Sequence, residues 1–149
     1  MINRPPYEHF RVRVYLERST ARPSEVVSIT NSADAYRFFA NLQYEDRETF
    51  HGLHLDARSR VLSCEEVSRG SLTGSLVHPR EVFKGAVLAN AASLLVAHNH
   101  PSGDPCASAE DRSITARLKS CGELLGIPLL DSLIIGASTY YSFADDNAL

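Results

Sequence analysis

The sequence has few cysteines, no long hydrophobic run and no excess of positive charge. Its three cysteines, Cys64, Cys106 and Cys121, are odd in number and show no CxxC spacing, which argues against a disulfide framework and suits a reducing cytoplasm. No apolar stretch is long enough to span a bilayer and no charged-then-apolar leader opens the chain, so we expect a soluble intracellular protein without a membrane partner. The net charge of −3 gives no global support for nucleic-acid binding, although local basic clusters remain open.

Strand-like and helix-like segments alternate along the 149 residues, and 44% of the residues are hydrophobic. This is enough for a single domain with its own core, and we expect no second one. Residues 1–24 form a polar, arginine-bearing arm, in which charged and apolar residues alternate over 11–16. This segment is an added edge strand, a partner-binding segment or an ordinary solvated face. Residues 25–149 form the domain. The sequence thus predicts an α/β fold, a single mixed sheet flanked by helices.

Capping residues, periodicity and turn residues indicate the individual elements. We expect helices at 30–42, at 79–90 and from residue 108 to the stop at Gly126. Gly122 lies inside the last helix at a cost of about 1 kcal/mol, so a close packing contact is expected there. Strands are expected in a hairpin at 48–56 and 60–67, near 75–77, in the apolar run after Ser93, and as a final pair at 128–136 and 139–143.

One stretch contains a candidate set of metal-binding residues. The apolar run 94–97 has the length of a buried strand and ends in His98 and His100, whose side chains point the same way because side chains alternate along a strand. A loop rich in proline and glycine follows, and then a helix with Asp111 in its first turn. Two imidazoles and a carboxylate that converge are a ligand set for a divalent metal, most naturally zinc.

This ligand set is incomplete, because structural zinc sites usually have four protein ligands. Three leave room for a water whose pKa a zinc ion can lower to about 7, so the pattern favours hydrolysis. Other interpretations stand beside this one. A histidine at the end of an apolar strand is often a core residue, and Ser108-x-x-Asp111 is also a capping box. Capping and metal binding are compatible, since a helix N-terminus helps to hold an anionic ligand.

The pattern His98-x-His100, seven residues, Ser108-x-x-Asp111 resembles the JAMM metalloprotease motif of the JAB/MPN domain. Three further stretches resemble the RadC branch of that family: VHPREVFK at 77–84, HNHPSGDP at 98–105 and GELLGIPLLD at 122–131. The likeness covers roughly residues 25–145. It implies the JAB/MPN architecture, which is similar to that of cytidine deaminases, and a JAMM-type zinc metallopeptidase with one Zn²⁺ per chain. Nothing matches the helix-hairpin-helix region of fuller RadC proteins, so we expect the short, stand-alone form.

The resemblance also implies roles for two more residues. Glu48 corresponds to the glutamate that takes a proton from the metal-bound water and passes it to the leaving group, although spacing alone does not choose it over Glu45, Glu65, Glu66 or Glu81. Ser108 corresponds to the serine that hydrogen-bonds to the attacking water or the oxyanion.

Four other residues are singled out with less specific expectations. Cys106 stands where relatives should have a small polar residue; its thiol is an extra soft zinc ligand, a redox brake on the site or a simple substitution. His51 and His54 lie on opposite faces of their strand and are taken as structural or surface residues. His78 belongs to a family stretch but not to the metal pattern, and its role is open.

Three functions compete. The leading one is hydrolysis of a peptide or isopeptide bond by metal-activated water. The second is a DNA-repair role on nucleic acid, as a nuclease or accessory; the contiguous triplet His98-Asn99-His100 does not support it, because HNH nucleases draw these residues from separated positions. The third is a non-catalytic MPN scaffold, which loss of metal ligands would mark, and none is lost here. The sequence identifies neither the substrate nor the oligomeric state.

Overall fold

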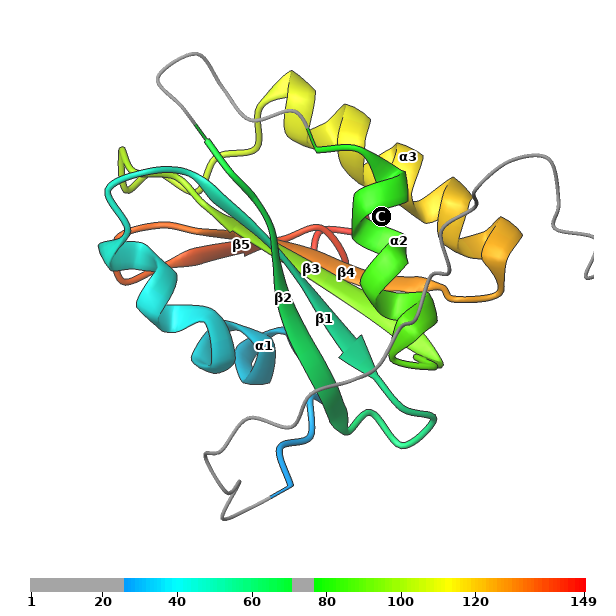
Figure 1. Cartoon of the computed structure of the whole chain (residues 1–149). Coiled ribbons are helices and arrows are strands. Elements are labelled where there is room, and N and C mark those ends of the chain that lie inside the picture. The colour runs from blue at the N-terminus through cyan, green and yellow to red at the C-terminus, as the bar shows by residue number, and fades with distance from the viewer. Residues whose placement is uncertain (1–25, 71–76) are drawn as a thin grey trace, which may run out of the picture.

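The computed structural model describes residues 26–70 and 77–149, which form one mixed sheet with helices on both faces (Figure 1). The arm at 1–24 and most of the strand expected near 75–77 lie outside the described residues. No helix in the described part of the chain is long and apolar enough to cross a membrane. The elements are α1 (Ser32–Phe39), the 3-10 helix η1 (Ala40–Tyr44), β1 (Thr49–Leu55), β2 (Val61–Arg69), α2 (Pro79–Leu88), β3 (Ser93–Asn99), α3 (Ala109–Leu125), β4 (Leu129–Ile135) and β5 (Tyr140–Ser142).

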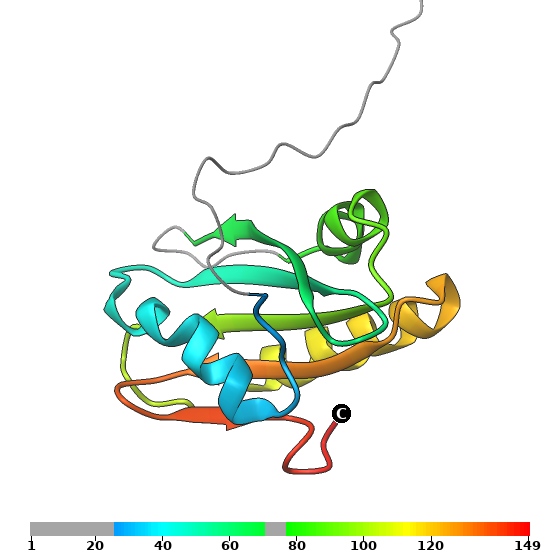
Figure 2. The same ribbon diagram turned by 90° about the horizontal axis from the view of Figure 1, so that it is seen from below.

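The strands lie in the order β2-β1-β3-β4-β5. All neighbours are antiparallel except β3 and β4, which α3 connects as a parallel crossover. Figure 2 shows α1 on the near face of the sheet and α3 on the far face. The predicted fold class, a mixed sheet flanked by helices in a small α/β domain, is confirmed.

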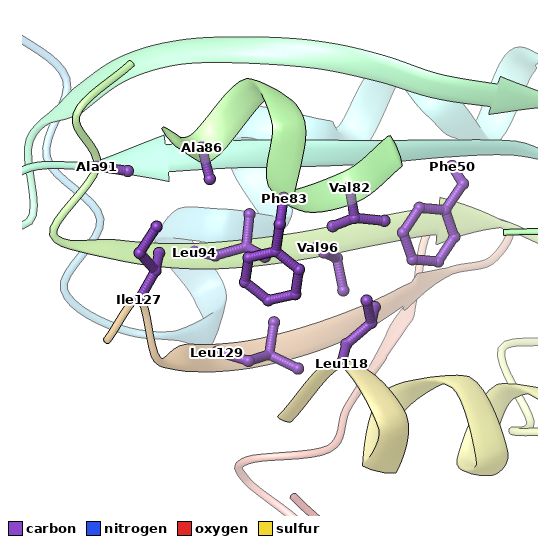
Figure 3. Packing of buried hydrophobic residues seen from close by; sticks show 10 residues of the cluster. All are labelled: Phe50, Val82, Phe83, Ala86, Ala91, Leu94, Val96, Leu118, Ile127 and Leu129. Carbon is purple, nitrogen blue, oxygen red and sulfur yellow. The ribbon is translucent and has the colours of Figure 1, made fainter. Parts of the chain in front are cut away.

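Every residue of β3 is buried, because helices cover both faces of this central strand. Its side chains alternate between two cores. Leu94 and Val96 pack under α2 and α3, in the cluster whose ten side chains Figure 3 shows. Leu95 and Ala97 pack under α1 on the opposite face. The same alternation sends His98 toward α3 and Asn99 toward the α1 face.

Two glycines set the geometry of α3 and the strand after it. Gly126 ends the helix in the left-handed region at φ 70°, as its position predicted. Gly122 is buried within the helix, and a Cβ atom added there would lie 2.6 Å from the carbonyl oxygen of Ile127. The close contact expected at Gly122 is thereby confirmed: α3 packs directly against the chain that enters β4.

Candidate metal centre

Three side chains, from β3, the loop after it and α3, meet at one end of the sheet. His98 is the next-to-last residue of β3, His100 directly follows the strand, and Asp111 lies in the first turn of α3. One ligand atom from each residue lies within 4.8 Å of the other two. The structure therefore brings together the three residues that the spacing singled out, and this is the candidate metal centre.

The distances within the cluster suit a zinc ion. Two ligands of a tetrahedral zinc, each about 2.0 to 2.2 Å from the ion, lie roughly 3.3 to 3.6 Å apart. The two Nε2 atoms of His98 and His100 are 3.2 Å apart. Asp111 Oδ1 lies 3.0 Å from His98 Nε2, and Oδ2 lies 3.4 Å from His100 Nε2. The first two distances are shorter than this range by about 0.1 to 0.3 Å, so a slight separation of the side chains would let two imidazole nitrogens and a carboxylate hold one small divalent cation.

The loop after β3 orients His100. Its Nδ1 lies 2.8 Å from the Asp104 carbonyl oxygen, and in the neutral ring an N–H donated there leaves Nε2 unprotonated and available to a metal ion. The loop is anchored in turn, because Ala137 donates its N–H to the Gly103 carbonyl and Gly103 has a φ of 83°. A carbonyl bonded to the far nitrogen of a metal-ligating histidine is a common supporting contact in metal sites.

His98 is held by packing. It is 2% exposed, and its ring stacks on Phe50 with centroids 5.7 Å apart and planes 13° from parallel. Its Nδ1 atom is buried and has no hydrogen-bond partner among the described residues. The ring is therefore fixed by its neighbours in the core while Nε2 points into the cluster.

Ser108 and Asp111 form the capping box that the sequence allowed. The Asp111 Oδ2 atom accepts hydrogen bonds from the Ser108 amide and hydroxyl at 2.8 and 2.7 Å, and Ser108 Oγ accepts from the Asp111 amide. Burial opposes ionisation of Asp111, but hydrogen bonds from His100, His98 and Ser108 outweigh it and hold the pKa of the carboxyl well below its usual range. The Asp111 side chain thus takes part in the cap of α3 and also belongs to the candidate metal centre.

The hydrogen bond to Asp111 raises the pKa of His100. Burial lowers this pKa, and the negative charge of Glu48 raises it. Glu48 comes immediately before β1 and is half-buried. In the antiparallel pairing of β1 with β3 the last pair is Phe50 and His98. Glu48 lies two residues before Phe50 and His100 two residues after His98, so both lie at the same end of this strand pair. Glu48 and Asp111 also line one groove.

The four other glutamates considered from the sequence lie in different surroundings. Glu45 and Glu66 both pair with Arg69, and Glu81 pairs with Lys84. Glu65 lies over Gly85 of α2, where burial raises its pKa. None of the four lines the groove beside Asp111. The geometry therefore favours Glu48, which spacing alone did not.

Asn99 is a supporting residue that the sequence reasoning missed. It is 1% exposed, and its Oδ1 atom accepts hydrogen bonds from the Thr49 amide and hydroxyl at 2.8 and 3.0 Å. Its Nδ2 donates to the Arg47 carbonyl at 2.9 Å. These bonds hold the residues on both sides of Glu48 against the strand that carries His98. A polar residue at the end of an otherwise apolar strand was the available signal, since buried amides require partners.

We expect Asn99→Ala to lower the free energy of unfolding by about 2 to 3 kcal/mol, because it leaves the buried Thr49 amide and the part-buried Arg47 carbonyl without partners. Urea unfolding measures this loss, and hydrogen exchange at the Thr49 amide should accelerate along with it. Asn41→Ala is the matched control, because Asn41 is exposed in η1 and should change stability by less than about 0.5 kcal/mol. Equal stability of the two variants would contradict this role of Asn99.

The remaining residues of interest lie apart from the cluster. Cys106 is an exposed free thiol in the loop, and its sulfur is not among the clustered ligand atoms. His51 is half-buried with Nε2 3.1 Å from the Thr49 hydroxyl, whereas His54 is buried on the opposite face beside Ser63. His78 is the N-cap of α2, where its ring accepts a hydrogen bond from the Arg80 amide.

The mixed sheet with its flanking helices is the α/β fold of the JAB domain, and it brings two histidines and an aspartate together where they could hold a metal ion. The chain belongs to the RadC family: the family model described as RadC-like JAB domain matches residues 29–148.

Curated relatives agree with this family. The chain is 44% identical over 133 residues to a UPF0758 protein of Symbiobacterium thermophilum, an alignment that covers 89% of this chain and 57% of the relative. It is 50% identical over 108 residues to one of Clostridium novyi, covering 72% and 47%, and 48% identical over 122 residues to one of Protochlamydia amoebophila, covering 81% and 53%. The chain thus spans between about half and three fifths of the length of these relatives.

Proposed function

We propose that this chain is a zinc-dependent hydrolase of the JAMM type that cleaves a peptide or isopeptide bond. The observation that carries the proposal is the convergence of His98, His100 and Asp111 beside a groove: the two Nε2 atoms and the two carboxylate oxygens are 3.0 to 3.4 Å from their nearest neighbours on the other residues. One zinc ion per chain is the cofactor. Three protein ligands are typical of catalytic zinc sites, which keep a position for water or substrate.

A zinc ion held by His98, His100 and Asp111 would supply an acidified water and would polarise the carbonyl of the substrate. Glu48 takes the proton from the water and delivers it to the departing amine, a role that suits a carboxylate that lies beside the ligands and is not one of them. Ser108 donates a hydrogen bond from its hydroxyl to the oxyanion that develops on the substrate, a contribution of about 3 kcal/mol where such a donor is well placed. Before the oxyanion forms, the hydrogen bond to Asp111 holds the Ser108 hydroxyl near the centre.

Two alternatives have less support. A role on nucleic acid needs clustered positive charge, whereas the groove beside the centre contains Glu48, Glu110 and Asp111 and a single arginine. A non-catalytic scaffold does not need three metal-ligating side chains kept together. The cytoplasmic location stays a prediction.

The direct test is to incubate the zinc-loaded chain with a pool of proteome-derived peptides and with lysine-linked isopeptides, and to identify products by mass spectrometry. We expect new termini that a zinc chelator abolishes and that added zinc restores. A chain that holds one zinc and cleaves neither pool would overturn the proposed hydrolysis.

A further inference from the structure

A groove of about 290 Å³ runs from the metal centre along α3. We call it the α3 groove. At one end lie Glu48 and Asp111, next to the centre. The apolar residues that line it are Phe50, Val77 and Ile114. Glu110 and Ser113 also line it, and Arg117 is the lining residue farthest along α3 from Asp111. A groove lined by both apolar and charged residues suits an extended chain that carries apolar and charged side chains.

Arg117 is exposed, and no ion pair to it is found within residues 26–70 and 77–149. Arg37, Arg60 and Arg69 each pair with a carboxylate of the chain, whereas Arg47, Arg58 and Arg112 have no ion pair within the described residues either. Of the described arginines without an ion pair, Arg117 is the one that lines the α3 groove. Arg117 follows Asp111 by six positions in α3, a rise of about 9 Å along the helix axis. Its guanidinium is therefore a cation without an ion-pair partner in the described structure, on the helix that also carries Asp111.

We propose that the α3 groove binds an extended peptide with an acidic side chain about three residues from the scissile bond. Three residues of extended chain cover about 10 Å, which matches the separation along α3. The fork of the guanidinium pairs well with a planar carboxylate, and apolar side chains between the two ends rest on Ile114 and Val77. This inference rests on the proposed function, because it names the kind of substrate that the same site takes.

A nucleic-acid strand fits the α3 groove less well. Its phosphates repeat along the chain, so they would meet Glu48 and Glu110 as well as Arg117. A peptide can place one negative charge at Arg117 and neutral groups elsewhere. The arrangement of charges therefore favours a peptide.

The test measures binding and needs neither zinc nor turnover. The probes are two acetylated, amidated octapeptides of alanine and glycine that differ at one position, glutamate in one and lysine in the other. Each is titrated into the zinc-free, ¹⁵N-labelled full chain while amide shifts are followed. We expect shifts at Ser113, Ile114 and Arg117, and an affinity about three- to five-fold higher for the glutamate peptide, as for an exposed ion pair.

Arg117→Glu should reverse this preference, whereas Arg58→Glu, the same charge change in the exposed turn at the far end of β1, should leave it unchanged. An Arg117→Glu chain that still prefers the glutamate peptide overturns the inference, as does a wild-type chain that binds both peptides equally. A ten-nucleotide oligothymidylate that shifts the same amides more strongly than either peptide also overturns it. If the preference holds but the zinc-loaded chain hydrolyses nothing, the proposed function fails and the α3 groove remains an acidic-peptide site.

Discussion

Glu48→Gln is expected to lower the hydrolysis rate by about 10² to 10⁴, because an amide cannot take the proton from the attacking water. Zinc content should stay at one per chain, since Glu48 is not among the clustered ligand atoms. Glutamine keeps the size of the side chain in its half-buried position before β1. The variant thus separates loss of the base from loss of the site. Initial rates on a peptide that the zinc-loaded wild type cleaves, measured alongside bound zinc, provide the comparison.

Glu45→Gln is the matched control for this variant. Glu45 lies three residues upstream, carries the same charge and pairs with Arg69 at the surface. Its replacement should leave the rate within about two-fold of wild type, since surface substitutions are usually worth less than 0.5 kcal/mol. Normal turnover in Glu48→Gln, or an equal loss in both variants, would show that the base is elsewhere.

Asp111→Asn is expected to weaken zinc binding at least about 100-fold, because replacement of residues that merely support metal ligands already costs 10- to 100-fold. Asparagine is isosteric and keeps a carbonyl oxygen that can accept the hydrogen bonds of the capping box. The expected loss of zinc affinity therefore results from the lost charge of the ligand more than from a change in the N-terminal cap of α3. Competition with a chromophoric zinc chelator measures the affinity.

Glu110→Gln controls for the charge change in this experiment. Glu110 is the neighbouring residue in the first turn of α3, lines the same groove and is exposed. Both variants lose one negative charge near the helix N-terminus, so a purely electrostatic effect of the helix would lower zinc affinity equally in each. A much larger loss in Asp111→Asn identifies Asp111 as a ligand, and equal small losses would exclude it.

The candidate centre was the most predictable part of the molecule. Alternation along a strand requires His98 and His100 to share a side, and Ser108-x-x-Asp111 marks a helix start, so local rules already placed all three ligand residues near each other. Family likeness added Glu48, and the pairing of β1 with β3 gives a physical reason for that choice, since it sets Glu48 and His100 at the same end of the strand pair. This register depends on pairs of residues 38 to 48 positions apart and has no local signature.

Element boundaries were predicted less well, for local reasons. The helix expected to continue to Asn90 ends at Leu88, and Asn90 itself adopts a left-handed φ of 51°. The helix expected at 30–42 divides into α1 and the 3-10 helix η1. The contacts of Asn99 and the groove that Arg117 lines could not be predicted, because both require knowing which distant segments lie beside β3 and α3.

Zinc-edge X-ray absorption on the zinc-loaded wild-type chain tests the metal centre most directly. The spectrum reports the kind and number of atoms bound to the ion. The account predicts one zinc per chain with two imidazole nitrogens and one or two further oxygen or nitrogen ligands at about 2.0 to 2.2 Å, and no sulfur. A chain that takes up no zinc, or a shell that contains the thiolate of Cys106 in place of an imidazole, would contradict it.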